Sequence, residues 1–158
     1  MTLDQLTQYL QEKFEGQIEL LETGRVEPFF LLKNKDELVS FCRAIKDDVK
    51  LEIDYLCNLG AVDTGERFEV VYNVASVARR IRFDFKIIFE YEGAEIDSIQ
   101  EVWPAANWYE REVWELYGIN IKNHGHLKRF LLPDDWAQGH PMRKNWDAPD
   151  FKRMPEVQ

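Results

Sequence analysis

The sequence is poor in the residues that build disulfide frameworks and cofactor sites. It contains 2 cysteines, Cys42 and Cys57, with no Cys-x-x-Cys pair. Two isolated thiols cannot form a disulfide framework, nor by themselves complete an iron–sulfur or zinc site, and they suit a reducing compartment. The glycine-rich patterns GxGxxG and GxxxxGK[ST] are absent, as is the nucleophile pattern GxSxG. Nucleotide binding and nucleophilic catalysis therefore have no support in the sequence.

Long apolar runs are also missing. No segment approaches the roughly 18 uninterrupted apolar residues of a transmembrane helix. The amino-terminal stretch MTLDQLTQYLQEKF resembles neither a secretory signal nor a basic transit peptide. We therefore expect any association with a membrane to be indirect, through another protein.

Positive charge is scarce in the first two thirds of the chain. The formal net charge is −9, and residues 1–101 account for all of it, with 21 acidic and 12 basic residues against 8 of each in the remainder. An acidic body argues against nucleic acid as a partner, because phosphates require a basic footprint. Acidity of this kind is most simply interpreted as an aid to solubility.

The first hundred residues show alternating helical and strand patterns. Apolar residues recur at helical spacing in two segments and with period-two alternation in others, most clearly over residues 82–91. The expected elements are a helix over 3–14, strands over 18–21 and 28–32, a helix over 34–49 with a capping box at Asn34 and Glu37, and strands over 51–55, 68–74 and 82–91. This order predicts an α+β fold: a two-layer domain over residues 1–102, with a mixed sheet and helices on one face.

Residues 103–158 have a different composition. They hold all 5 tryptophans, all 3 histidines and 5 of the 6 prolines. A capping box at Asn107 and Glu110 and a glycine cap at Gly118 predict a helix of about ten residues. No regular period follows, so we expect residues 119–158 to form a long extended arm. Tryptophan and arginine anchor many protein interfaces, and this arm is predicted to lie on a partner.

Two alternatives remain open on the residues alone. His124, His126 and His140 could hold a catalytic zinc in a small metal-dependent enzyme, although structural or interfacial histidines are the simpler interpretation. Arg111 could pair with Glu115 on one helix face, or extend two donors to a carboxylate or carbonyl of a partner.

The segment after residue 102 resembles a known family. It contains W-P-x-A-N-W-x-E-R-E-x-W-x-x-x-G-I, followed by L-x-R-x-L-L-P-D-D-W-x-x-G-H-P-x-R-K. This pattern is similar to the signature of the 30-kilodalton (C) subunit of respiratory complex I. The family includes the chloroplast and cyanobacterial J subunit and the corresponding subunits of energy-converting membrane-bound hydrogenases. Residues 103–146 carry the specific match.

The resemblance implies a structural subunit with no cofactor and no catalytic residues of its own. It implies a place in the peripheral arm of an ion-translocating oxidoreductase, on the cytoplasmic side of the membrane or its organelle equivalent. The partner would be the large subunit that resembles the hydrogenase large chain, while other subunits hold iron–sulfur clusters and an NADH, quinone or NiFe site. The implied interface residues are Trp108, Glu110, Arg111, Glu112, Gly118, Arg129, Asp134, Trp136, His140, Pro141 and Arg143.

Overall fold

The computed structural model describes residues 1–148, so positions 149–158 of the predicted arm lie outside the description. The first helix, α1 (Leu3–Lys13), begins with a capping box between Thr2 and Gln5. Its Leu6 and Leu10 are buried, which confirms the helical spacing.

Two short strands follow as predicted. β1 (Ile18–Leu20) and β2 (Phe29–Leu32) pair in antiparallel fashion. The chain then enters a 3-10 turn, η1 (Lys35–Glu37), where the Asn34 side chain accepts the N–H of Asp36 rather than closing a capping box with Glu37.

The second helix is shorter than its apolar pattern suggested. α2 (Leu38–Asp47) ends before Val49, which is 75% exposed and not on the buried face. The carboxylate and carbonyl of Asp48 accept the next N–H groups and turn the chain. For this reason the strand expected over residues 51–55 is wrong for residues 51–54: Leu51 lies in the turn, Ile53 follows it, and both are buried before the next strand begins at Tyr55.

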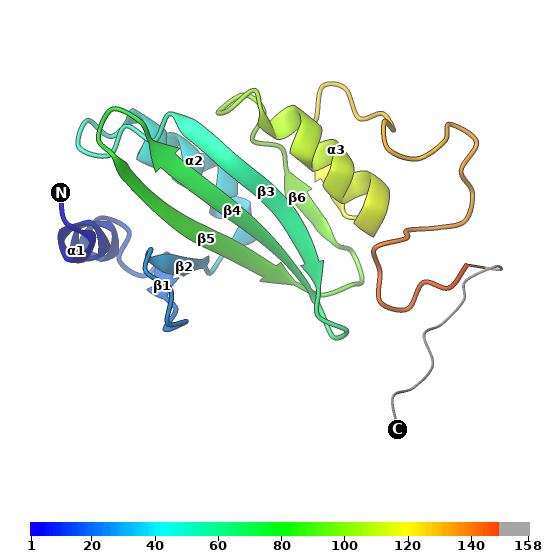
Figure 1. Cartoon of the computed structure of the whole chain (residues 1–158), viewed down its shortest axis with the longest axis horizontal. Helices are drawn as coiled ribbons and strands as arrows, with labels where there is room; N and C mark the ends of the chain where they lie inside the picture. The colour runs from blue at the N-terminus through cyan, green and yellow to red at the C-terminus, as the bar shows by residue number, and fades with distance from the viewer. Residues whose placement is uncertain (149–158) are drawn as a thin grey trace.

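Three long strands form the centre of the sheet: β3 (Tyr55–Asp63), β4 (Phe68–Ser76) and β5 (Ile81–Phe89). Within residues 1–148 they join β1 and β2 in a five-stranded sheet of order β1-β2-β5-β4-β3 (Figure 1). The β2–β5 pair is parallel and the others are antiparallel, so the predicted mixed sheet is confirmed.

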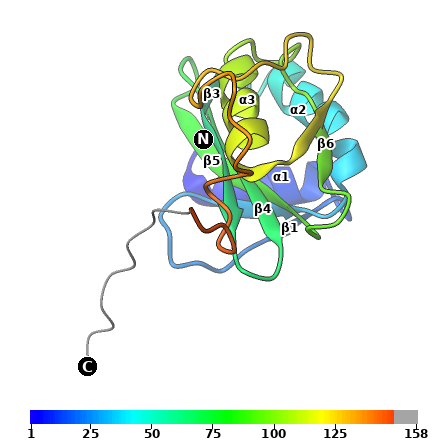
Figure 2. The same cartoon turned by 90° about the vertical axis from the view of Figure 1, so that its right-hand side faces the viewer.

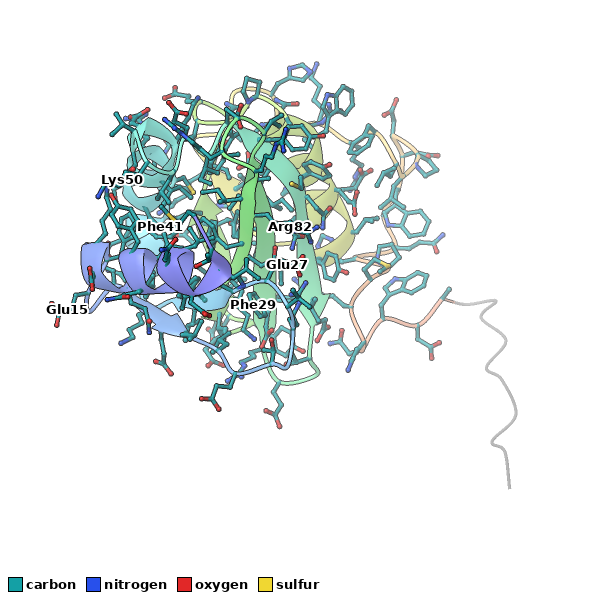
Figure 3. All side chains as sticks on the ribbon, turned by 60° about the vertical axis from the view of Figure 1, so that its left-hand side comes forward. Glu15, Glu27, Phe29, Phe41, Lys50 and Arg82 are labelled. Carbon is teal, nitrogen blue, oxygen red and sulfur yellow. The ribbon has the colours of Figure 1, made fainter. Side chains whose placement is uncertain are left out.

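One face of this sheet forms the core. Phe83, Phe85 and Ile87 of β5 are fully buried, as their alternation predicts. Phe41 of α2, labelled in Figure 3, packs edge-on against Phe85 with ring centroids 5.0 Å apart. Asp84 departs from the alternation: it lies on the opposite face, yet is 1% exposed beneath the segment that precedes β2.

The remaining elements are β6 (Glu95–Asp97), α3 (Ala106–Tyr117) and β7 (Asn120–Lys122). β6 and β7 pair in parallel, so the expectation of no regular structure after Gly118 is wrong at this strand. Residues of α3 and β7 join the same hydrophobic core as the central strands. Across residues 1–148, no helix has the length and apolar character that crossing a membrane requires.

Candidate partner interface: the arm along α3

The arm follows α3 from its first turns to its last. Successive arm residues contact the helix in order: His124 meets Asn107, Lys128 meets Arg111, and Arg143 meets Tyr117. Figure 2 shows the later arm, drawn in orange to red, passing beside α3 and the central strands. The helix therefore serves as the support on which the arm is laid.

The start of α3 differs from the prediction. Its N-cap is Ala105, with no side-chain cap. Asn107 instead donates its amide to Gln100 Oε1 at 3.0 Å, and Glu110 points inward. The expected capping box of Asn107 and Glu110 is therefore wrong, because tertiary contacts take both side chains.

Glu110 is a buried carboxylate that ties the helix to the segment before it. Its oxygens accept the Ser98 hydroxyl at 2.6 Å and the Ile99 N–H at 2.7 Å. Burial raises the pKa of Glu110 from 4.5 to about 7, against these two hydrogen bonds, which lower it. Near neutral pH this group is partly protonated, in a position that is 1% exposed.

His124 lies next to Glu110 at the base of the arm. Its Nδ1 accepts the N–H of His126, so the ring proton is assigned to Nε2, which donates to the carbonyl of Asn107 at 3.2 Å. The same Nε2 is 3.8 Å from Glu110 Oε2. Burial lowers the pKa of His124, opposed by the bond to Asn107. Both ring nitrogens are thus used within the chain.

Arg111 holds the middle of the arm. Its Nε donates to the carbonyl of Lys128 at 2.7 Å and its Nη2 to that of Arg129 at 3.3 Å. Its guanidinium also lies 4.6 Å from the ring centroid of Trp108 and 4.8 Å from that of Phe130. The Arg111 guanidinium, which the sequence suggested could bind a partner, therefore donates to carbonyls of this chain. It is not paired with Glu115.

Glu115 pins the arm at two points. Its buried carboxylate accepts the N–H groups of Phe130, Leu131 and Leu132 at 3.2, 3.1 and 2.7 Å. Its backbone carbonyl accepts Nδ1–H of His140 at 3.1 Å. A single residue thereby fixes both ends of the loop formed by residues 133–139. Hydrogen bonds to a carboxylate, such as the three from Phe130, Leu131 and Leu132, are about twice as strong as bonds between neutral groups.

The arm also completes the C-terminus of α3. Helix ends leave carbonyls without partners, and besides the bond from His140, Met142 N–H donates to Leu116 O while Arg143 Nε donates to Tyr117 O at 2.6 Å. A cation at this end of a helix is favoured by the helix dipole. Gly118 has φ +72°, and a Cβ there would overlap the His140 ring, so close packing as well as backbone conformation requires glycine.

A last contact fastens the arm to the β3–β4 turn. Asp63 accepts the hydroxyl of Tyr91 and the N–H groups of Gly65 and Lys144, the last at 2.9 Å. Burial alone would raise the pKa of Asp63, but these hydrogen bonds outweigh it and keep the pKa below its usual value. The arm is thus fastened to the body from His124 to Lys144.

The three histidines do not form a metal site. Among residues 1–148, no three His, Cys, Asp or Glu side chains are placed to hold a metal ion. His124 bonds near the start of α3 and His140 at its end, roughly 12 Å apart along the axis at 1.5 Å per residue. The alternative of a three-histidine enzyme therefore lacks a site.

The implied interface residues fall into three groups by burial. Glu110 and Arg111 are buried, and Trp108 and Asp134 are exposed. The other seven are partly buried: Glu112, Gly118, Arg129, Trp136, His140, Pro141 and Arg143. Sequence reasoning missed the roles of Glu115 and Asp63, because nothing in their local pattern shows that distant backbone N–H groups converge on them.

The fold and the site define an α+β domain with a C-terminal arm laid along one helix. The family model "Respiratory-chain NADH dehydrogenase, 30 Kd subunit" matches residues 31–152. The chain belongs to this family, as the tryptophan- and arginine-rich signature indicated.

Two relatives and one solved structure show the range of the similarity. The C subunit of the NADH-quinone oxidoreductase of Chloroherpeton thalassium is 34% identical over 87% of this chain and 58% of its own length. The C subunit of the F(420)H(2) dehydrogenase of Methanosarcina mazei is 39% identical over 73% of each chain. A chain of an archaeal membrane-bound sulfane sulfur reductase covers 98% of both chains with a TM-score of 0.77, and at 19% identity it supports the fold alone.

Proposed function

We propose that this chain is a structural subunit in the peripheral arm of a complex I-like, ion-translocating oxidoreductase. In this proposal it carries no redox cofactor, lies on the cytoplasmic side of the membrane, and docks through its arm on the subunit that resembles the hydrogenase large chain. Iron–sulfur clusters and the substrate sites belong to its partners. Family membership supports the proposal, and so do the different electron-transfer systems named among the relatives.

The observation that carries the proposal is a fastened arm with exposed aromatic side chains. Trp108 and Phe130 are 57% and 40% exposed, although Arg111 holds both rings in place. Large aromatic groups that are exposed and immobilised are typical of interface anchors, because little side-chain entropy is lost on binding.

In this proposal the electron donor binds to partner subunits and not to this chain. The named relatives differ in their electron donor, whereas the arm that would dock is a property of this chain. We therefore assign the chain a role in assembly rather than in the chemistry.

Co-purification tests the proposal. A tagged full-length chain is expressed in source cells that lack their own copy, the membranes are solubilised, and the captured proteins are identified by mass spectrometry. We expect the large subunit and other peripheral-arm subunits in near-equal amounts. Trp136→Ala should reduce their recovery while the purified variant keeps its circular dichroism spectrum, since Trp136 packs on Trp146 away from the core. Capture of no oxidoreductase subunits by the wild-type chain would refute the proposed function.

A further inference from the structure

One surface formed by α3 and the arm carries apolar and cationic side chains, most of them exposed or partly exposed. We call it the Trp108 face, and it consists of Trp108, Arg111, Lys128, Arg129, Phe130 and Leu131. Trp108, Phe130 and Leu131 are 57%, 40% and 50% exposed. The Trp108 and Phe130 rings are in contact and Leu131 is the next residue along the chain, so these exposed apolar groups form a patch rather than scattered exposure.

The aromatic part of this face is rigid. The rings of Trp108 and Phe130 meet edge-to-face with centroids 5.2 Å apart. Arg111 contacts both rings and is itself fixed by its bonds to the carbonyls of Lys128 and Arg129. The backbone of Phe130 and Leu131 is held by Glu115. The aromatic part of the patch is therefore preorganised for binding.

The charge of the Trp108 face is unbalanced. Within residues 1–148, no acidic side chain forms an ion pair with Arg111, Lys128 or Arg129, although Arg111 is 7% exposed. A charge that is taken out of water is normally paired, because desolvation is costly. Of the acidic side chains on α3, Glu110 is bonded to Ser98 and Glu115 to the arm backbone, and the partly exposed Glu112 forms no ion pair with these cations within residues 1–148.

Excess positive charge here contrasts with the rest of the chain. Residues 1–101 carry a net charge of −9. Cations that form no ion pair in the described part of the chain and that surround an apolar patch indicate a complementary surface that is negative and apolar.

We propose that the Trp108 face binds an acidic, apolar surface of a partner protein. The partner's carboxylates meet Lys128 and Arg129, and its apolar side chains cover Trp108, Phe130 and Leu131. The proposal rests on the proposed function, since it names the chemistry by which the arm recognises its partner. It adds Lys128, Phe130 and Leu131 to the residues that the family signature implied.

The test uses the same co-purification from membranes, with the full chain carrying Lys128→Glu and Arg129→Glu. Charge reversal at a complementary interface should lower partner recovery by about ten-fold or more. Lys128→Glu alone should have a smaller effect in the same direction. The ammonium of Lys128 makes no hydrogen bond or ion pair within residues 1–148, so this variant does not threaten the fold. Trp108→Ala should also lower recovery by about ten-fold or more, as for an interface anchor.

The matched control reverses two exposed cations outside the Trp108 face, Lys33→Glu and Arg43→Glu. It should retain wild-type recovery. Raising the sodium chloride concentration during capture should weaken the wild-type complex more than the Lys128→Glu complex, because the salt-sensitive attraction has been removed.

The outcomes separate this inference from the proposed function. If the wild-type chain captures the complex and the face variants capture it equally well, the inference is wrong and the proposed function stands. If the wild-type chain captures no oxidoreductase subunits, both fail. If light scattering shows that the purified chain self-associates, and charge reversal abolishes this, the Trp108 face binds a second copy of this chain. Binding of a DNA probe that is lost on charge reversal, with partner recovery unchanged, would assign the cations to nucleic acid. Either result overturns the proposal.

Discussion

The body and the arm of this chain are held by different forces. The body, which includes α3 and β7 as far as Ile121, is organised by a core in which Phe30, Phe83 and Phe85 are fully buried. The described arm contributes few buried side chains after Ile121, and it is held by polar contacts to Arg111, Glu115 and Asp63. Apolar burial is non-directional and tolerates small shifts, whereas these hydrogen bonds fix positions.

The body and the arm therefore have different roles. A core built from many dispersed contacts gives global stability, and no single polar pair decides it. An arm held by a few directional bonds can be rigid without a core of its own, which leaves its aromatic side chains free for a partner. It also means that single substitutions in α3 should release the arm while the body stays folded.

The largest expected effect comes from the core. Phe85→Ala removes a ring stacked on Tyr72 with centroids 4.6 Å apart and should lower the free energy of unfolding by about 3–5 kcal/mol. Chemical denaturation followed by circular dichroism measures this, and body and arm should unfold together. Phe130→Ala serves as the exposed aromatic control, and an equally large loss there would erase the distinction between the regions.

The second-largest effect on stability depends on pH. It comes from Glu110, which connects α3 to Ser98 and Ile99 in the segment before it. The folded-state pKa of Glu110, about 7, lies above its usual 4.5. Between these values the folded state binds more protons than the unfolded state, so this group makes the protein less stable as pH rises from about 4.5 to about 7. The total loss is about 3 kcal/mol, at 1.36 kcal/mol per pKa unit.

Glu110→Gln should flatten that part of the pH profile, because glutamine can still accept a hydrogen bond but does not ionise. His124, whose pKa is lowered, acts in the opposite direction as pH falls, so the informative quantity is the difference between wild type and variant. Denaturant unfolding at a series of pH values from 4.5 to 8 measures it. Parallel profiles for the two proteins would show that Glu110 does not titrate in this window.

The smallest effect on overall stability should be the most local. Glu115→Gln weakens three hydrogen bonds to the arm backbone and should cost the arm about 1–2 kcal/mol, close to a ten-fold rise in local opening. Hydrogen exchange measured by mass spectrometry should accelerate over residues 128–148 and stay slow in β4 and β5. Glu112→Gln, a partly exposed neighbour on α3, is the matched control. Faster exchange in both regions would mean that the arm is part of the core's cooperative unit.

Local patterns predicted the central elements well where packing and pattern agree. The alternation in residues 82–91 predicted a strand with one buried face, and Gly118 predicted the end of α3. Predictions failed where a polar side chain had a distant partner. Asn107 and Glu110 resembled a capping box, but Gln100, Ser98 and Ile99 take both side chains.

The candidate site was predicted in outline but not in its contacts. The composition of residues 103–158 indicated an arm rich in interface residues, and the signature indicated the family. The bonds that hold the arm could not be predicted, because Glu115 and Asp63 act on backbone N–H groups that carry no sequence signal. Interface roles for the exposed residues stay predictions until partner recovery is measured.

By itself, the sequence determined the periodic elements, the separation of an acidic body from a tryptophan-rich end, and the family, since each depends on residue type and near spacing. Only the tertiary structure decided that Arg111 and Glu115 bond to the arm rather than to each other, and that, within residues 1–148, Arg111, Lys128 and Arg129 form no ion pair beside Trp108. The physical reason is that hydrogen bonds and ion pairs act over a few ångströms in space. Which groups come within that range is set by the packing of the whole chain and not by the spacing of residues along it.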